Sequence, residues 1–250
     1  MPSATHDVSS MLEQEGLVRI DGEDFYAIPD VGSLPPFLVA VVSPSDHWLY
    51  VSTAGGLTAG RINAENCLFP YRTDDLLHKV QTFSGGYTGI RVGETLWEPF
   101  TGRLDHRTRR SIARSINGDR YLVEEVHWEL GIRARCTWCF SDRSGIVRRV
   151  SLDLLPDRTD SCRVDLLDGL RDLVPAGAGV GVMQSMSCLI NAYTRAERTG
   201  SSTLATIAME SALTDRAEPA ESLYATVVWG TGLPDAGIHL QARASSEFAE

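Results

Sequence analysis

The sequence predicts a mainly β fold built from antiparallel sheets, with one or two peripheral helices. Three successive segments, "YLVEEVHWEL", "IRARCTWCF" and "IVRRVSLDLL", alternate apolar and polar side chains with the period of two that is typical of strands. Only one segment has the periodicity of an amphipathic helix. The 250 residues are 43% hydrophobic, which is enough to bury a core. So many antiparallel strands need a sandwich or a barrel to cover their faces.

The first third of the chain contains several short strand signals. Residues 1–16 form a polar lead-in, after which "LVRI" and "DFYAI" are expected to be strands. A hairpin is predicted from residues 37–43 and 47–52, because a Pro-Ser turn separates two apolar runs. Further strands are expected at "KVQTF", "YTGIRV" and "TLWEPF".

The three alternating segments between residues 121 and 155 predict a sheet with one solvated face. Their odd-numbered positions include Glu125, Arg133 and Arg135, so we expect these side chains to face water. Acidic residues of one strand would then face arginines of the next strand. Gly131 and Gly145 mark the tight turns that join the strands.

The last third of the chain is expected to contain one strand, one helix and two more strands. The strand is predicted at residues 163–167, and the helix at 181–198, with Gly200 as its stop. "TLATIAMES" and "SLYATVVWG" are the later strands. Residues 236–250 resemble the start of a linker, so the β domain is predicted to span residues 17–235.

Charge and cysteine content limit the possible partners and the compartment. The net charge of −10 argues against a nucleic-acid partner or an anionic membrane, because both favour a basic face. The five cysteines follow no regular framework, which is typical of free thiols in a reducing compartment. The N-terminal residues have neither a basic region nor an apolar region of a secretion signal. The sequence therefore favours a cytoplasmic protein that does not enter a membrane.

A polar, aromatic-rich region provides the candidate binding residues. The stretch "AGGLTAGRINAENCLFPYRTDD" interrupts the strand pattern between residues 54 and 75, and "TLWEPF" follows it. Aromatic faces and planar polar groups are the side chains that bind sugars. The candidate substrate-binding residues are Arg61, Tyr71, Arg72, Asp74, Asp75, Trp97 and Glu98.

Each candidate also has a purely structural interpretation. Asp74 and Asp75 can cap a short helical turn, and Trp97 can be a packing residue of an edge strand. The glycines that follow Ala54 can form a bulged turn with positive φ. The whole stretch from 54 to 75 can equally be a loop that packs only on its own domain.

Known catalytic and metal-binding motifs are not found in the sequence. Cys136 and Cys139 have CxxC spacing, but residues three apart in a strand point to opposite faces, and no second pair completes a metal site. The glycines match neither a P-loop nor a dinucleotide fingerprint. The histidines lack metal-ligand spacing, and no serine lies in a GxSxG elbow. No catalytic residue, metal or cofactor is therefore assigned.

Several longer segments together resemble one family. In chain order they are "WLYVSTAGGLTAGRINAENCLFPYRTDD", "LWEPF", "VDLLDGLRDLVPAG", "SCLINAYTRAE" and "AEPAESLYATVVWGTGL". They are similar to the N-terminal region of large bacterial proteins described as cellobiose-phosphorylase-like or glycoside-hydrolase-like. The resemblance covers residues 46–233.

This resemblance implies a galactose-mutarotase-like antiparallel β-supersandwich that is accessory to catalysis. In such phosphorylases the domain precedes an (α/α)₆ barrel, which carries the catalytic carboxylic acid, and inorganic phosphate is the co-substrate. The parent protein would act on β-glucosides, by phosphorolysis or by hydrolysis. This chain would shape the substrate cleft, contact carbohydrate together with the barrel through residues 55–75, and form a homodimer interface.

Two other functions remain open from the sequence. A self-sufficient sugar mutarotase would need a histidine and a carboxylate on one concave sheet, for which His127 and Glu125 are the candidates. A structural assembly module would bind no ligand. Asp168, Arg171 and Asp172 are expected to form a structural network at the junction of a strand and a helix.

Overall fold

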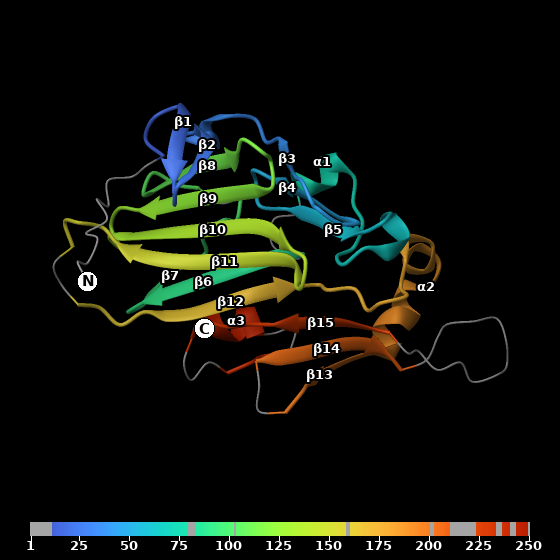
Figure 1. Ribbon diagram of the computed structural model, residues 1–250. Helices are drawn as coiled ribbons and strands as arrows, with labels where there is room; N and C mark the ends of the chain where they lie inside the picture. The colour runs from blue at the N-terminus through green and yellow to red at the C-terminus, as the bar shows by residue number, and fades with distance from the viewer. Residues whose placement is uncertain are drawn as a thin grey trace, which may run out of the picture.

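The computed structural model confirms a mainly β protein with antiparallel sheets and three short helices (Figure 1). It describes residues 12–79, 84–102, 104–158, 161–200, 203–210, 224–233, 237–240 and 244–249. Most of the strand predicted at "KVQTF", and most of the polar lead-in, lie outside the described residues. The described strands form one six-stranded sheet and three sheets of three strands each.

The six-stranded sheet is the first layer of the sandwich. Its strands follow the order β1-β2-β8-β9-β10-β11, and every neighbouring pair is antiparallel. Their bounds are β1 Gly16–Ile20, β2 Glu23–Ile28, β8 Thr108–Ser115, β9 Arg120–His127, β10 Ile132–Ser141 and β11 Gly145–Leu154. Gly131 and Gly145 have positive φ at the two predicted turns, as tight hairpin connections require.

The prediction of a solvated face is wrong for β9 and for Arg133 of β10, whereas β11 does expose Arg149 and Ser151 on the face that carries Arg135. The register pairs Glu125 with Ala134 and Glu124 with Arg135, so consecutive glutamates point to opposite faces of the sheet. Both glutamates and Arg133 are at most 2% exposed. The acid–arginine pairing itself exists, because a Glu124 carboxylate oxygen lies 2.8 Å from Arg135 Nε and 3.6 Å from Arg133 Nε.

Apolar residues beside this pair bury the part of the outer face that belongs to β2, β8 and β9. Phe25, Ala113 and Leu122 form a cluster there, and the side chain of Leu12 packs into it at 1% exposure. The alternation of polar and apolar residues in β9, β10 and β11 could not reveal that this face is covered, because Leu12 lies far from these strands along the chain.

Two smaller sheets form the second layer and enclose the main core. One has the order β3-β4-β5 and the other β12-β6-β7. Their bounds are β3 Leu38–Val41, β4 His47–Ser52, β5 Leu57–Arg61, β6 Gly85–Val92, β7 Thr95–Trp97 and β12 Asp165–Arg171. Leu49 and Val51 of β4 pack against Val123 of β9 and Trp138 of β10. Ile90 of β6 packs against Ile132 in the same way.

The segment from residue 54 to 75 is more regular than a loop. It contains β5, which pairs with β4, the short 3-10 helix η2 (Ala64–Asn66) and helix α1 (Asp74–Leu77). Gly55 has φ 101° in the turn before β5, which agrees with the interpretation of a bulged turn. The stretch is therefore an integral part of the second layer.

The predicted helix is shorter than expected. Helix α2 spans Val180–Tyr193, with non-helical dihedral angles at Met186, and residues 194–198 form strand β13. The hydroxyl of Thr194 donates to the Ile190 carbonyl, and Thr194 pairs with Met209 of β14. Strand pairing, which sequence periodicity does not detect, therefore ends the helix before Gly200, which has positive φ at the end of β13.

The chain finishes with a small sheet and a short helix. Strands β13 (Thr194–Arg198), β14 (Leu204–Met209) and β15 (Ala225–Trp229) form an antiparallel sheet. Helix α3 (Ala244–Ala249) lies behind it in Figure 1 and contacts β6 through Phe248. A 3-10 helix, η1 (Val31–Ser33), joins β2 to β3. No helix among the described residues is both long enough and apolar enough to cross a membrane.

We predict that Gly86→Ala destabilises the fold by about 1–3 kcal/mol, which is typical of overpacking a core. A Cβ at Gly86 would lie 2.7 Å from Arg148 Nε and 3.1 Å from the Trp138 ring. Gly169→Ala on the neighbouring strand β12 is the matched control, because a Cβ there meets nothing within 4 Å. Urea unfolding of both variants measures the difference, and equal stabilities would contradict the prediction.

Candidate functional site

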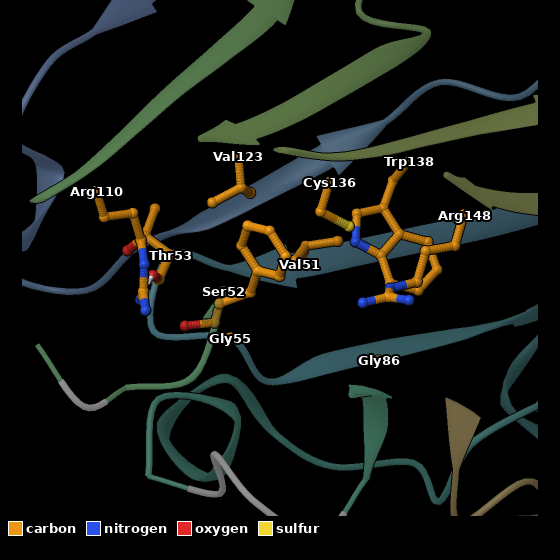
Figure 2. Close-up of a pocket in the computed structure, with 11 residues that line it drawn as sticks. Val51, Ser52, Thr53, Gly55, Gly86, Arg110, Val123, Cys136, Trp138 and Arg148 are labelled. Atoms are coloured by element: carbon orange, nitrogen blue, oxygen red, sulfur yellow. Dashed lines mark hydrogen bonds between the residues drawn. The ribbon is translucent and has the colours of Figure 1, made fainter. Parts of the chain in front are cut away.

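The interior of the sandwich contains a small pocket between the two layers (Figure 2). Arg110 and Arg148 lie at its opposite ends, with Val51 and Cys136 between them. The remaining lining residues are Ser52, Thr53, Gly55, Gly86, Phe100, Val123 and Trp138. Its free interior is about 20 Å³, which is room for about one water molecule. A sugar does not fit there in this conformation.

Arg110 binds to all three sheets that surround the pocket. Its Nε donates to Glu125 at 2.9 Å, and its terminal nitrogens donate to the backbone carbonyls of Thr53 and Thr101. Thr53 follows β4 and Thr101 follows β7, so one guanidinium joins the large sheet to both small sheets. The Arg110 and Glu125 side chains are 3% and 0% exposed.

The Glu125 carboxylate accepts two further hydrogen bonds besides those from Arg110. Trp97 Nε1 donates to one carboxylate oxygen at 3.3 Å, and the Phe100 backbone nitrogen donates to the other at 3.0 Å. Phe100 has φ 65°, a strained value for a residue other than glycine. Burial raises the pKa of Glu125, whereas Arg110 opposes that rise. The carboxylate therefore has a structural role: it neutralises Arg110 and fixes the backbone at Phe100.

Arg148 forms a second ion pair, whose partner Asp168 is exposed at the edge of the pocket. One terminal nitrogen donates to both oxygens of Asp168, at 2.7 and 2.8 Å, and the other donates to Thr88 Oγ1 at 2.6 Å. Thr88 Oγ1 in turn donates to Asp168. This network joins β11 to β6 and β12, while the guanidinium lies over the Trp138 ring at 5.7 Å. Asp168 is thus part of a structural network, as the sequence suggested.

The other two residues of the proposed structural network have different partners. Asp172 accepts a hydrogen bond from Ser84 Oγ at 2.7 Å. Arg171 places its guanidinium over the Tyr87 ring at 3.5 Å. The three residues therefore make separate contacts. Asp168 and Arg171 of β12 contact β6, and Asp172, which follows β12, contacts Ser84, which precedes β6.

His127 and Glu125 do not form an accessible acid–base pair. His127 is 3% exposed, its ring packs edge-on against Trp97, and its Nδ1 accepts from the Leu130 backbone nitrogen. Burial lowers the pKa of His127. Since both side chains are enclosed and Glu125 is paired with Arg110, this pair does not support the mutarotase hypothesis.

The three predicted residues Arg61, Tyr71 and Arg72 are not gathered around one cavity. Arg61 forms a bidentate pair with Asp46 at the exposed end of β5, with nitrogen–oxygen distances of 3.2 and 2.7 Å. This pair lowers the pKa of Asp46. Tyr71 is 48% exposed, and its ring meets that of Trp48 edge-on at 6.3 Å. The Nε of Arg72 is buried without a hydrogen-bond partner among the described residues.

The remaining candidates divide between surface and core. Asp74 and Asp75 begin α1, where the Asp74 carboxylate accepts from the Asp75 backbone nitrogen and Asp75 accepts from Thr73 Oγ1. Trp97 is only 6% exposed and packs in the core. Glu98 lies near Tyr87 and Arg171. The N-cap of α1 is Thr73, without a side-chain cap bond, so the aspartates form its first turn, whereas the packing interpretation of Trp97 accounts for its contacts.

Two exposed tyrosines and the partly buried Trp48 form a group that we call the aromatic platform: Trp48, Tyr50 and Tyr71. The Trp48 ring lies 6.3 Å from each of the two tyrosine rings. Tyr50 is 43% exposed, and Trp48 also packs against the α2 cluster. Trp48 and Tyr50 were not predicted as site residues, although their spacing of two in β4 places them on one face. Adding Tyr71 required the tertiary structure.

Comparison with known proteins gives no assignment: no family model matches the chain, and no curated protein matches it. Among the described residues, no group of three or more histidine, cysteine, aspartate or glutamate side chains could hold a metal ion. The candidate site is therefore chosen by geometry alone. The interior pocket is too small for a ligand, so the aromatic platform on the surface is the candidate site.

We predict that Arg110→Met destabilises the protein by about 3–5 kcal/mol, because it leaves the Glu125 carboxylate buried without its counter-charge. Replacing both residues, as Arg110→Met with Glu125→Leu, should cost less than the sum of the single changes. Arg61→Met is the exposed control and should leave the unfolding midpoint unchanged. Additive effects of the two buried substitutions, measured by chemical denaturation, would contradict this account.

We also predict that the native protein resists alkylation at Cys136. Burial raises the pKa of this thiol to about 11, so little thiolate exists at neutral pH. Cys188 is exposed on α2 and should react first with iodoacetamide. Mass spectrometry of peptides from the labelled protein separates the two sites. Equal labelling of Cys136 and Cys188 under native conditions would refute the prediction.

Proposed function

We propose that this chain is a non-catalytic accessory domain of a carbohydrate-active enzyme, which contacts carbohydrate through the aromatic platform. The observation that carries the proposal is the exposed position of Tyr50 and Tyr71 beside Trp48. Aromatic faces supply much of the contact area in sugar binding, because they cover the apolar C–H faces of pyranose rings. Asp74 and Asp75 follow Tyr71 closely and offer exposed carboxylates to sugar hydroxyls.

The pairing of the interior carboxylates Glu124 and Glu125, and of Asp168, favours an accessory role over a catalytic one. Glycoside cleavage by a carboxylate pair needs two groups about 5–9.5 Å apart that flank an accessible bond. Glu124, Glu125 and Asp168 each have an arginine partner instead. Paired carboxylates of this kind hold the sheets together and are not free to act as acid or base.

The parent enzyme follows from the family resemblance rather than from the platform. It would be a glycoside phosphorylase or hydrolase acting on β-glucosides, with catalysis in an (α/α)₆ barrel and inorganic phosphate as co-substrate in the phosphorylase case. This domain would pack on that barrel, shape the cleft, form a homodimer interface and work in the cytoplasm. Its partners would be carbohydrate and protein, with no role in nucleic-acid or membrane binding.

The platform is tested by titrating the chain with cello-oligosaccharides in a calorimeter. Tyr50→Ala and Tyr71→Ala should each weaken binding about two- to twelvefold, if each ring contributes 0.5–1.5 kcal/mol of stacking. Tyr26→Ala is the matched control, because Tyr26 is equally exposed, at 49%, but lies on β2 of the large sheet.

The result also separates the competing functions. No binding by the unmodified chain, or binding that both tyrosine variants retain, would overturn the platform proposal and favour a structural assembly module. Turnover of a sugar by the chain itself would overturn the accessory role and restore the mutarotase hypothesis.

A further inference from the structure

The small sheet β13-β14-β15 has an open edge at β13. Among the described residues, β13 pairs with β14 alone, and residues 195–198 are all exposed. β13 lies at the lower margin of the molecule in Figure 1, whereas β15 contacts the body of the domain, where Thr226 Oγ1 donates to the Val174 carbonyl. An exposed strand edge presents backbone donors and acceptors that can bind another strand.

The backbone of β13 points alternately toward β14 and toward the open edge. The Tyr193 carbonyl accepts from the Glu210 nitrogen. The Thr199 nitrogen donates to the Leu204 carbonyl, so positions 193 and 199 both face β14. In an antiparallel ladder, positions that bond to a neighbouring strand alternate with positions that face the other way. The N–H and C=O of Ala196, at the centre of β13, therefore point to the open edge.

The charges of β13 select one register for pairing with a second copy of the chain. A twofold axis makes two copies of β13 antiparallel, and the residue on the axis defines the register. Opposite charges directly across a strand pair stabilise it, and like charges destabilise it. An axis at Arg195 would oppose two arginines, and an axis at Glu197 would oppose two glutamates. An axis at Ala196 places each Arg195 opposite Glu197 of the other copy.

These charges differ from those that protect an edge strand against pairing. Protecting charges of a single sign repel a second copy in every register, whereas β13 carries both signs two positions apart. Neither proline nor glycine interrupts the strand. Arg195 Nε lies 2.6 Å from a Glu197 carboxylate oxygen of the same chain, and the two side chains are 62% and 55% exposed. Pairing would exchange this partner for the equivalent one of the second copy, so the ions choose the register and the backbone supplies the new bonds.

We infer that two copies of this chain associate through β13, edge to edge and antiparallel, with Ala196 on the twofold axis. The backbone groups of Ala196 then exchange two hydrogen bonds with those of the second copy. The small sheets of the two copies become one continuous sheet. The homodimer is part of the proposed function, and the inference rests on that proposal in this respect, whereas the strand and the register follow from β13.

The pairing surface is small, so the dimer should be weak. A standard interface involves about 20–30 residues a side, whereas β13 has five residues. Dimers should therefore be sought by sedimentation equilibrium of the full chain at concentrations up to about 100 µM, in the range of weak and transient interfaces.

The first test removes the central donor of the edge. Ala196→Pro eliminates the outward N–H, and we expect it to weaken self-association at least tenfold. Ala225→Pro is the matched control at the other edge of the same sheet. The Gly230 nitrogen donates to the Thr203 carbonyl, so Ala225, at the start of β15, also points away from β14. Proline is tolerated at such positions, because the N–H that it removes has no partner in the sheet.

The second test exchanges charges on the exposed side chains and leaves the backbone unchanged. Arg195→Glu alone and Glu197→Arg alone each oppose like charges twice in the Ala196 register, so each variant should be monomeric. A mixture of the two variants restores opposite charges and should form a heterodimer. A purely structural role for these residues does not predict recovery on mixing. Circular dichroism melting checks that every variant is folded.

Each outcome decides the inference. Loss of the dimer in Ala196→Pro but not in Ala225→Pro, with recovery in the mixture, supports it. A monomeric unmodified chain, a dimer that persists in Ala196→Pro, or a dimer that is lost in Ala225→Pro overturns the pairing through β13. Failure of the mixture to associate overturns the register. Cello-oligosaccharide titration of Ala196→Pro should match the unmodified chain, so failure of the strand pairing and failure of the aromatic platform are distinguishable.

Discussion

The guanidinium of Arg110 is the one interaction on which the arrangement of the layers depends. It reaches across the interior from β8 and binds Glu125, the carbonyl after β4 and the carbonyl after β7. Burying such a charge is costly unless every donor has a partner, so the positions of both small sheets are fixed relative to the large one. Arg148 repeats this arrangement at the other end of the pocket, where it holds β6 and β12 through Asp168 and Thr88.

These two ion pairs also explain why the interior is not the functional site. A polar centre in a β-sandwich resembles an active site by residue type, with arginines, carboxylates, a serine and a thiol close together (Figure 2). Arg110 and Arg148 already donate to acceptors within the protein. The space between the two arginines has room for about one water molecule. The polar groups of the core therefore hold the layers in one arrangement.

The aromatic platform differs from this interior because it is open to solvent. Tyr50 and Tyr71 are 43% and 48% exposed around the partly buried Trp48. Trp48 and Tyr50 belong to β4 of the sheet β3-β4-β5, and Tyr71 lies in the connection between η2 and α1. The platform is therefore the surface on which the proposed carbohydrate contact rests.

Much of the fold was determined by local sequence pattern. The period of two located β9, β10 and β11, and glycines located their turns, because side-chain alternation and positive φ are properties of a few neighbouring residues. The packing role of Trp97 and the helical turn that begins at Asp74 were also within reach of local reasoning. The face assignment of Glu125 and Arg133 was not, because it depends on which strand or cluster covers each side of the sheet.

Only the tertiary structure decided the register, the partners of the charges and the composition of the surface sites. Arg110 meets Thr53 across 57 positions, and Thr88 meets Asp168 across 80, so no local pattern links them. Residues 194–198 were expected to continue the helix but form a strand, because pairing with β14 satisfies their backbone groups. The sequence determined which segments could be strands and which side chains could bind a sugar. Long-range pairing then decided which of those side chains were consumed in holding the layers together and which remained exposed.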